Sequence, residues 1–266
     1  MFLPYDISFE SIYQMDKEHW HNGGWLAMEY SLSQKLAAEL AGTYLLVLGG
    51  PGSAIVAVGV FGIPWGPMTL FFNAIGFAIA IIGGIYALGH ISGGHFNSAI
   101  TLGLLVSGKM PRRDALPYIV AQFAGALLAS LTALLFFGYT VGNVVYFGAS
   151  YPGPRGPVVA FIAELIMTFF LLWIVQGVVN YGKLGTGFAG IAIGFYIMFE
   201  VMIIGTVSGG SVNPARSFGP AVVSGILFNP AFSQWIYFTA PFIGGALGAI
   251  TFAWLFKPRK EVLLPG

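Results

Sequence analysis

Two segments of this chain are copies of one another, and each carries an asparagine in a setting that suits hydrogen-bond chemistry. Residues 89–99 align without gaps on residues 205–215, and both put Ser-Gly-Gly ahead of an asparagine, Asn97 and Asn213. An asparagine that opens a helix can accept bonds from the free N–H groups of that helix through its side-chain oxygen. Its amide NH2 is then left to donate into the space ahead. Two such helix ends facing each other predict a pore for neutral polar molecules.

The segments around these copies predict a membrane protein. The 266 residues are 57% hydrophobic and 8% charged, with a net charge of +1, and the mean hydropathy is +0.82. This composition excludes a soluble domain and argues against a nucleic-acid partner. A membrane-spanning helix needs about 20 apolar residues. Six segments qualify, namely 36–60, 68–89, 115–138, 157–180, 187–207 and 235–256.

Two further apolar segments, about 97–107 and 213–225, are too short to cross a bilayer and should enter it only half-way. Three spans in each repeat is an odd number, so the two halves must be inverted in the membrane. We therefore predict an all-α membrane protein with six transmembrane helices and two re-entrant half-helices in two inverted repeats. The expected domains are an N-terminal extension 1–33, a channel domain 34–256 and a tail 257–266, with repeats at about 34–138 and 157–256.

The distribution of basic residues predicts the orientation, because cytoplasmic loops carry an excess of Lys and Arg. Most of these residues fall before the first span or after the second, fourth and sixth spans. They are Lys17, Lys35, Lys109, Arg112, Arg113, Lys183, Lys257, Arg259 and Lys260. Arg155 alone falls in a loop on the other side. We expect a multi-pass protein of the cell membrane with both termini cytoplasmic.

Together these features resemble the aquaporin family, also called major intrinsic proteins, over nearly all of residues 34–256. The run Asn-Pro-Ala-Arg-Ser-Phe-Gly-Pro at 213–220 matches the second family signature fully, whereas the first reads Asn-Ser-Ala at 97–99 in place of Asn-Pro-Ala. The stretches 85–93 and 117–119 look most like archaeal-type aquaporins. The resemblance implies a passive water channel that excludes protons and ions. It also implies a homotetramer with one pore in each subunit, no cofactor, no metal and no enzymatic activity.

The resemblance assigns two constrictions to the pore. The central one is formed by Asn97, Ser98, Asn213 and Pro214, and the outer selectivity filter by Phe77, Val201, Gly210 and Arg216. An arginine in an apolar helix costs about 2.5–3.5 kcal/mol on insertion scales, so it needs a wet, functional setting. The less polar, wider ring left by valine and glycine implies passage of water and of small neutral solutes such as ammonia. The expectation for Ser98 is an open pore, and a leakier centre is the alternative.

Several residues of the two copies should support this pore. Backbone carbonyls facing the lumen are expected at Gly93, Gly94, His95, Gly209, Gly210 and Ser211. The side chain of His95 could face the lumen or brace its loop. Glu39 and Glu164 occupy matched Ala-Glu-Leu triplets and should accept bonds from the re-entrant loops, the alternative being a proton-coupled role in the lumen. Glu200 has no counterpart in the family pattern and is assigned no role.

Four other functions are weighed against a water channel. A glycerol or small-solute facilitator of the same family is favoured by Val201 and Gly210, whereas Phe77 and Ser217 favour the water branch. An ion-coupled secondary transporter also fits inverted repeats and half-helices, but no chain of carboxylates along the lumen is evident. A junction protein with a vestigial pore conflicts with the intact signature residues. An enzyme is disfavoured because the chain has no Cys, 4 His and no recognisable nucleophile–base pair.

Overall fold

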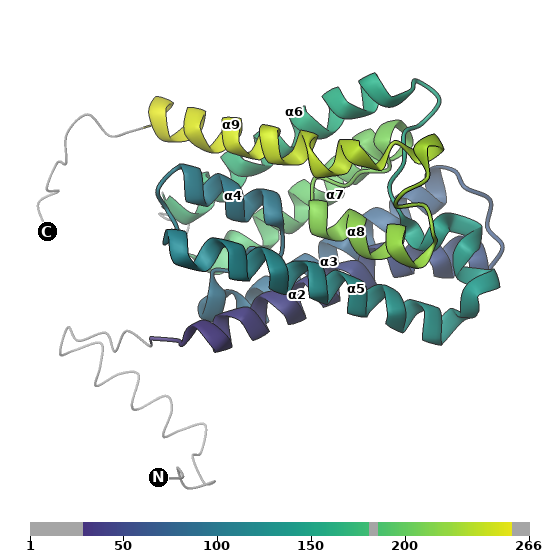
Figure 1. Cartoon of the computed structure of the whole chain (residues 1–266), viewed down its shortest axis with the longest axis horizontal. Helices are drawn as coiled ribbons and strands as arrows, with labels where there is room; N and C mark the ends of the chain where they lie inside the picture. The colour runs from purple at the N-terminus through teal and green to yellow at the C-terminus, as the bar shows by residue number, and fades with distance from the viewer. Residues whose placement is uncertain (1–28, 181–185, 257–266) are drawn as a thin grey trace, which may run out of the picture. The chain divides into compact units, whose positions relative to one another are not determined.

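The computed structural model describes residues 29–180 and 186–256 (Figure 1). The chain divides into a short unit, Met1–Ser31, and a helical unit, Leu32–Gly266. Most of the predicted N-terminal extension and all of the predicted tail lie outside the described residues. So do five of the basic residues used for orientation, Lys17, Lys183, Lys257, Arg259 and Lys260.

Six helical stretches of the described part are long and apolar enough to cross a membrane. They are built on α2 (Leu32–Ala54, continued by a π-helix over Ile55–Val60), α3 (Pro67–Ser92), α5 (Arg112–Gly142), α6 (Pro157–Asn180), α7 (Ala189–Ser208) and α9 (Ala240–Leu255). Two short helices, α4 (Ser98–Val106) and α8 (Pro214–Val223), follow the two Ser-Gly-Gly runs. Short 3-10 turns occupy Asn143–Gly148, Thr186–Phe188, Pro230–Phe232 and Gln234–Phe238, and the described residues contain no strand. The predicted all-helical fold class is confirmed.

The two repeats pack in the same way and exchange their half-helices. In the first repeat α2 packs against α3 and α5, and in the second α6 packs against α7 and α9. The half-helix α4 lies against α9 of the other repeat, and α8 lies against α5 (Figure 1). Each half-helix is therefore held largely by the opposite repeat.

Glycines allow the paired spans to approach closely. A Cβ on Gly125 in α5 would overlap the backbone carbonyl oxygen of Leu40 in α2, and a Cβ on Gly244 in α9 would overlap that of Leu165 in α6. Membrane helices use small residues in this way to bring their backbones together. The matched glycines therefore give both repeats the same close contact between spans, and these spans pack around the half-helices.

The third span is longer than the sequence predicted. It was expected to end at residue 138, but α5 continues to Gly142 across a break at Gly138, whose backbone angles are φ 73° and ψ 164°. Only glycine adopts such angles readily. The apolar residues beyond this kink continue the hydrophobic run, so hydropathy alone does not mark it.

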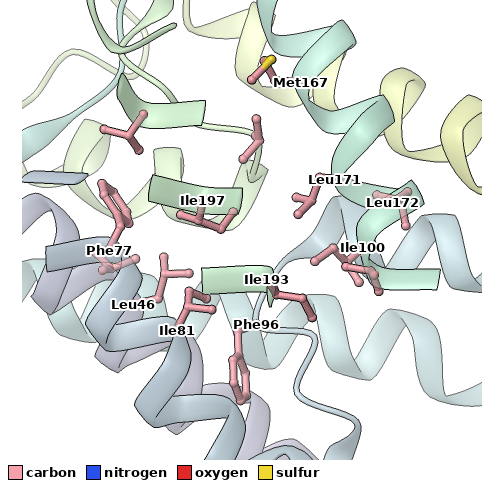
Figure 2. Close-up of a cluster of buried hydrophobic side chains, with 14 of the residues drawn as sticks. Leu46, Phe77, Ile81, Phe96, Ile100, Met167, Leu171, Leu172, Ile193 and Ile197 are labelled. Atoms are coloured by element: carbon pink, nitrogen blue, oxygen red, sulfur yellow. The ribbon is translucent and has the colours of Figure 1, made fainter. Parts of the chain in front are cut away.

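A cluster of buried apolar side chains occupies the middle of the helical unit. Figure 2 shows Phe77 and Ile81 of α3 near Ile193 and Ile197 of α7, with side chains of α6 across from them. Phe96, just before α4, and Ile100 in α4 belong to the same cluster, which therefore packs against the first half-helix.

Candidate functional site

Both half-helices begin at the predicted asparagines. The Oδ1 atom of Asn97 accepts bonds from the backbone N–H groups of Ala99 and Ile100, at 2.8 and 3.4 Å. The Oδ1 atom of Asn213 accepts from Ala215 and Arg216, at 3.1 and 3.3 Å. Each side chain therefore caps its helix, whose N-terminus carries about half a positive charge.

The amide groups of the two asparagines reach across to the opposite loop. The Nδ2 group of Asn97 donates to the carbonyl oxygen of Val212 at 2.9 Å, and that of Asn213 donates to the carbonyl oxygen of Phe96 at 2.9 Å. The sequence predicts that each NH2 group points into the lumen with both hydrogens. One of the two hydrogens instead joins the loops, which leaves the other for a passing molecule.

The residues that supply these carbonyls have a strained backbone. Phe96 has a φ of 48° and Val212 a φ of 43°, both in the left-handed region. This conformation is uncommon for any residue except glycine and is unfavourable for a β-branched one. In this conformation each carbonyl points toward the opposite asparagine. The two crossing hydrogen bonds therefore stabilise the unfavourable backbone angles of both residues.

Glu39 holds the first re-entrant loop. Its Oε1 atom accepts from the hydroxyl of Ser92 at 2.6 Å and from the N–H of His95 at 3.0 Å, and its Oε2 atom accepts from the N–H of Phe96 at 2.8 Å. Oε2 also accepts from the side-chain amide of Gln122 at 2.8 Å. The carboxylate is fully buried and has four donors, as a buried charge requires.

Glu164 makes the equivalent contacts with the second loop. Its Oε1 atom accepts from the hydroxyl of Ser208 at 2.7 Å and from the N–H of Ser211 at 2.9 Å, and its Oε2 atom accepts from the N–H of Val212 at 2.7 Å. Glu164 is also fully buried. Both carboxylates therefore face the loops, with their oxygens occupied by loop donors.

Ser98, at the position where a proline is usual, contributes a bond that a proline lacks. It is the first residue of α4, and its Oγ atom accepts from the backbone N–H of Ala215 in α8 at 3.2 Å. The side chain is fully buried. The serine therefore links the first turns of the two half-helices, and Pro214 occupies the matching position in α8 without such a group.

The four residues assigned to the outer filter form two contacting pairs, Arg216 with Phe77 and Gly210 with Val201. The guanidinium carbon of Arg216 lies 4.9 Å from the centroid of the Phe77 ring, within cation–π range. A Cβ built on Gly210 would stand 3.3 Å from the Cα of Val201. Phe77 and Val201 also belong to one buried cluster. Arg216 is fixed by a bond from its Nη1 group to the carbonyl oxygen of Gly148, at 2.8 Å.

A cavity of about 390 Å³ opens beside Arg216. Asn73 and Tyr151 supply polar side chains to its wall, Gly209 supplies backbone, and Leu70 and Trp65 supply apolar surface. Arg216 also lines this cavity, so its guanidinium borders a space large enough for small molecules.

The glycines expected to offer carbonyls lie in the two loops before the asparagines. Gly93, Gly94, Gly209 and Gly210 all have positive φ angles, between 55° and 92°. The carbonyl oxygen of Gly209 lies 3.4 Å from the hydroxyl of Ser150, which donates to it. Ser211 is buried, and its hydroxyl bonds with that of Ser217.

His95 has the contacts of a bracing residue. Its Nδ1 atom lies 3.0 Å from the hydroxyl oxygen of Thr101, and its ring centroid lies 5.2 Å from that of Tyr118. Its backbone N–H donates to Glu39. The side chain is thus tied to the half-helix α4 and to α5.

Sequence reasoning missed two pairs of residues that complete the loops. The hydroxyl of Tyr118 donates to the carbonyl oxygen of Ser92 at 3.0 Å, and the hydroxyl of Tyr237 donates to that of Ser208 at 2.6 Å. The same two serines donate to the buried carboxylates. The signal was available, because Ala-Gln-Phe-Ala-Gly at 121–125 resembles Ala-Pro-Phe-Ile-Gly at 240–244, and the same alignment places Tyr118 on Tyr237.

A metal centre has no support in the described ranges 29–180 and 186–256, where no three His, Asp or Glu side chains gather closely enough to hold an ion. The site instead consists of two capped half-helices, two braced loops and a buried arginine within six membrane-capable spans. This combination defines the class of the protein as a polytopic membrane channel built from two inverted repeats.

Comparison with known proteins gives the family. The family model described as "Major intrinsic protein" matches residues 27–252. The chain is 38% identical to Aquaporin NIP1-1 of Zea mays, covering 92% of this chain and 85% of that protein. It is 37% identical to the probable aquaporin AqpM of Archaeoglobus fulgidus, with coverages of 86% and 98%, and 36% identical to Aquaporin Z of Bradyrhizobium diazoefficiens, with coverages of 86% and 96%. The chain belongs to the major intrinsic protein family of membrane channels.

A solved structure shares the fold. The X-ray structure of the aquaglyceroporin from Plasmodium falciparum superposes with a TM-score of 0.77 at 23% identity, covering 86% of this chain and 98% of that one. At this identity the likeness concerns the fold alone. The resemblance to the aquaporin family, including archaeal and bacterial members, is confirmed.

Proposed function

We propose that this protein is a passive water channel that excludes ions and protons and also passes small neutral solutes. The observation that carries the proposal is the pair of crossing bonds, in which each asparagine caps its own half-helix and donates to the opposite loop. A water molecule between them meets two positive helix ends and two amide donors. It accepts bonds from both sides, so its own hydrogens point away and a proton relay through it is interrupted.

The outer filter supports the same function. Phe77, Val201, Gly210 and Arg216 form the filter in this proposal, and the fixed guanidinium of Arg216 repels cations while donating to neutral molecules. Asn97, Ser98, Asn213 and Pro214 form the central constriction. The backbone carbonyls of Gly93, Gly94, His95, Gly209 and Ser211 accept bonds along the lumen, and Glu39 and Glu164 position the two loops.

The cellular arrangement follows from the spans and their charges. Six spans put both ends of the channel domain on one side of the membrane, and Lys35, Lys109, Arg112 and Arg113 favour the cytoplasm for that side. We assign the chain to the cell membrane, with an extension 1–33, a channel domain 34–256 and a tail 257–266. The many exposed apolar side chains of the spans suit lipid contact and assembly as a homotetramer. The site contains no cofactor-dependent chemistry in this proposal, and the protein is not an enzyme.

Stopped-flow light scattering on proteoliposomes tests the proposal by comparing water with glycerol under an osmotic gradient. We expect fast shrinkage from water efflux, well above that of protein-free vesicles, and slow glycerol entry. Glycerol entry as fast as that of a facilitator would reassign the chain to the second candidate, which the small Gly210 and Val201 favour. A flux that saturates and follows an ion gradient would instead support a secondary transporter.

A further inference from the structure

The side chain of Arg216 makes one hydrogen bond within the described residues, and its acceptor is a backbone carbonyl. Only 2% of the residue is exposed, and its Nη1 group donates to the carbonyl oxygen of Gly148 at 2.8 Å. Among residues 29–180 and 186–256, its Nε group has no hydrogen-bond partner, and no carboxylate forms an ion pair with the guanidinium. The orientation of this filter residue therefore depends on where the Gly148 carbonyl lies.

The Gly148 carbonyl comes from a turn with an unfavourable backbone. Tyr146 has φ 49° and ψ 41°, Phe147 has φ 54° and ψ 27°, and Gly148 has φ 73°. Glycine adopts a left-handed conformation readily, whereas a residue with a Cβ atom does so at a cost. Two such residues in succession need other contacts to hold them, and unfavourable backbone of this kind clusters at functional sites.

The ring of Phe147 supplies contacts that hold the turn. Its side chain is 1% exposed and packs in a cluster with Ile55 and Ala133. A Cβ on Gly142, the last residue of α5, would overlap the ring, so the ring lies directly on the backbone of that helix. Burial of a phenylalanine ring is strongly favourable, and it can offset the cost of the left-handed backbone.

The other side of the turn packs against α2. A Cβ on Gly148 would stand 2.7 Å from the Cα of Pro51, so the two backbones are in direct contact. The chain after the turn is also held, because the side-chain amide of Gln234 donates to the carbonyl oxygen of Ser150 at 2.7 Å. A Cβ on Gly209 would lie 2.8 Å from the Cα of Ser150. The Gly148 carbonyl is therefore fixed between α5 and α2.

Phe147 itself is not among the described residues that line the cavity beside Arg216. Gly148 and Ala149 belong to the wall of that cavity, whereas the Phe147 ring packs in the apolar cluster with Ile55. A solute in the cavity therefore does not touch the ring. Any influence of Phe147 on selectivity must act through the Gly148 carbonyl and Arg216.

We propose that Phe147 is a positioning residue of the selectivity filter. Its ring, packed on Gly142, holds the turn 146–148 in its left-handed conformation, and the turn presents the Gly148 carbonyl that orients Arg216. Without the ring, the turn relaxes toward ordinary backbone angles and the guanidinium loses its fixed position. The filter then distinguishes water from larger solutes less well. The proposal rests on the proposed function, because it names a residue that sets the selectivity of the same pore.

A double-mutant cycle in proteoliposomes tests whether Phe147 acts through Arg216. Light scattering gives the glycerol-to-water permeability ratio of the native protein, Phe147→Ala, Arg216→Leu and the variant with both changes. Phe147→Leu keeps a branched apolar side chain in the cluster and is the conservative variant. Phe252→Ala removes a buried ring from α9, where 8% of the residue is exposed, and controls for a general loss of packing.

We expect Phe147→Ala to raise the glycerol-to-water ratio about threefold to tenfold, the range that corresponds to one lost hydrogen bond. Because both changes act on the same guanidinium, the double variant should match Arg216→Leu alone within about twofold, which is the margin of additivity. Phe147→Leu and Phe252→Ala should stay within about twofold of the native ratio by the same margin.

Two results would overturn the proposal. One is a ratio for Phe147→Ala within about twofold of that for Phe252→Ala, and the other is independent, additive effects of Phe147→Ala and Arg216→Leu in the double variant. If Phe147→Ala does not assemble, Phe147→Gly decides by the same ratio, since it removes the ring without the cost of a positive φ. Failure of the proposed function itself is seen separately, as native water permeability no higher than that of protein-free vesicles.

Discussion

Replacing Glu164 by glutamine should weaken the hydrogen bonds that hold the second re-entrant loop. The carboxylate accepts from Ser208, Ser211 and Val212, whereas the glutamine side chain has one acceptor oxygen and one donor group. If the oxygen takes the place of Oε2, the N–H of Ser211 faces another donor. If it takes the place of Oε1, the N–H of Val212 does. In either orientation one buried backbone N–H loses its partner.

The magnitude follows from these contacts. One unpaired buried N–H costs about 1–3 kcal/mol, and the remaining bonds weaken by about 1 kcal/mol each once their acceptor is neutral. Relief from burying a charge offsets part of this loss. The net destabilisation should be about 2–4 kcal/mol, which for a chain of this size lowers the melting temperature by about 5–15 °C.

Thermal unfolding of the purified protein in detergent measures this change, with Ile166→Val, at an exposed position on the same helix, as a control. Glu39→Gln should behave alike, since Glu39 braces the first loop through equivalent bonds. A melting temperature for Glu164→Gln within about 2 °C of the control would refute the bracing role, because it corresponds to less than about 1 kcal/mol. Loss of a proton-dependent flux without loss of stability would support the lumen-facing alternative.

Three further changes test the packing and the centre of the pore. Gly244→Ala should destabilise the protein by about 1–3 kcal/mol in thermal unfolding, because the added Cβ would overlap the carbonyl of Leu165. The control Gly83→Ala, whose Cβ would have no atom within 4 Å, should be neutral or stabilising by up to about 1 kcal/mol. Ser98→Ala should retain water permeability and lose about 0.5–1.5 kcal/mol of stability, since Ala215 keeps its bond to Asn213; a collapse of permeability would contradict this. Mercurial salts should leave water permeability unchanged because the chain has no Cys, and inhibition reversed by a thiol would oppose that expectation.

The sequence predicted the fold well because the relevant signals are local or repeated. Hydropathy locates the six spans, and the duplication of Asn97 in Asn213 locates the half-helices and their caps. The same duplication contains Ser92 with Ser208 and Tyr118 with Tyr237, so these pairs were within reach. Comparison of the two repeats therefore identifies residues that have the same structural role in each.

Other features were beyond the sequence because they oppose local preference or join distant segments. Valine rarely adopts a positive φ, so the sequence does not predict the strained backbone at Val212. It therefore does not predict the bond that the Val212 carbonyl accepts from Asn97 either. The bond between Ser98 and Ala215 likewise joins residues from different repeats. Glu200 breaks the repeat symmetry, and the sequence does not show that its Oε2 atom is buried without a partner among the described residues.

The crossing amide bonds also have a consequence for biogenesis. Asn97 and its acceptor Val212 are 115 positions apart along the chain, and Asn213 and Phe96 are 117 apart. At a synthesis rate of about 5–20 residues per second, the first loop leaves the ribosome on the order of 10 s before its counterpart. During that interval the Asn97 amide and the strained Phe96 carbonyl have no native partners. The first half-helix can settle only after the second repeat has been inserted, so closure of the pore centre is the last step of a folding process that begins at the other end of the chain.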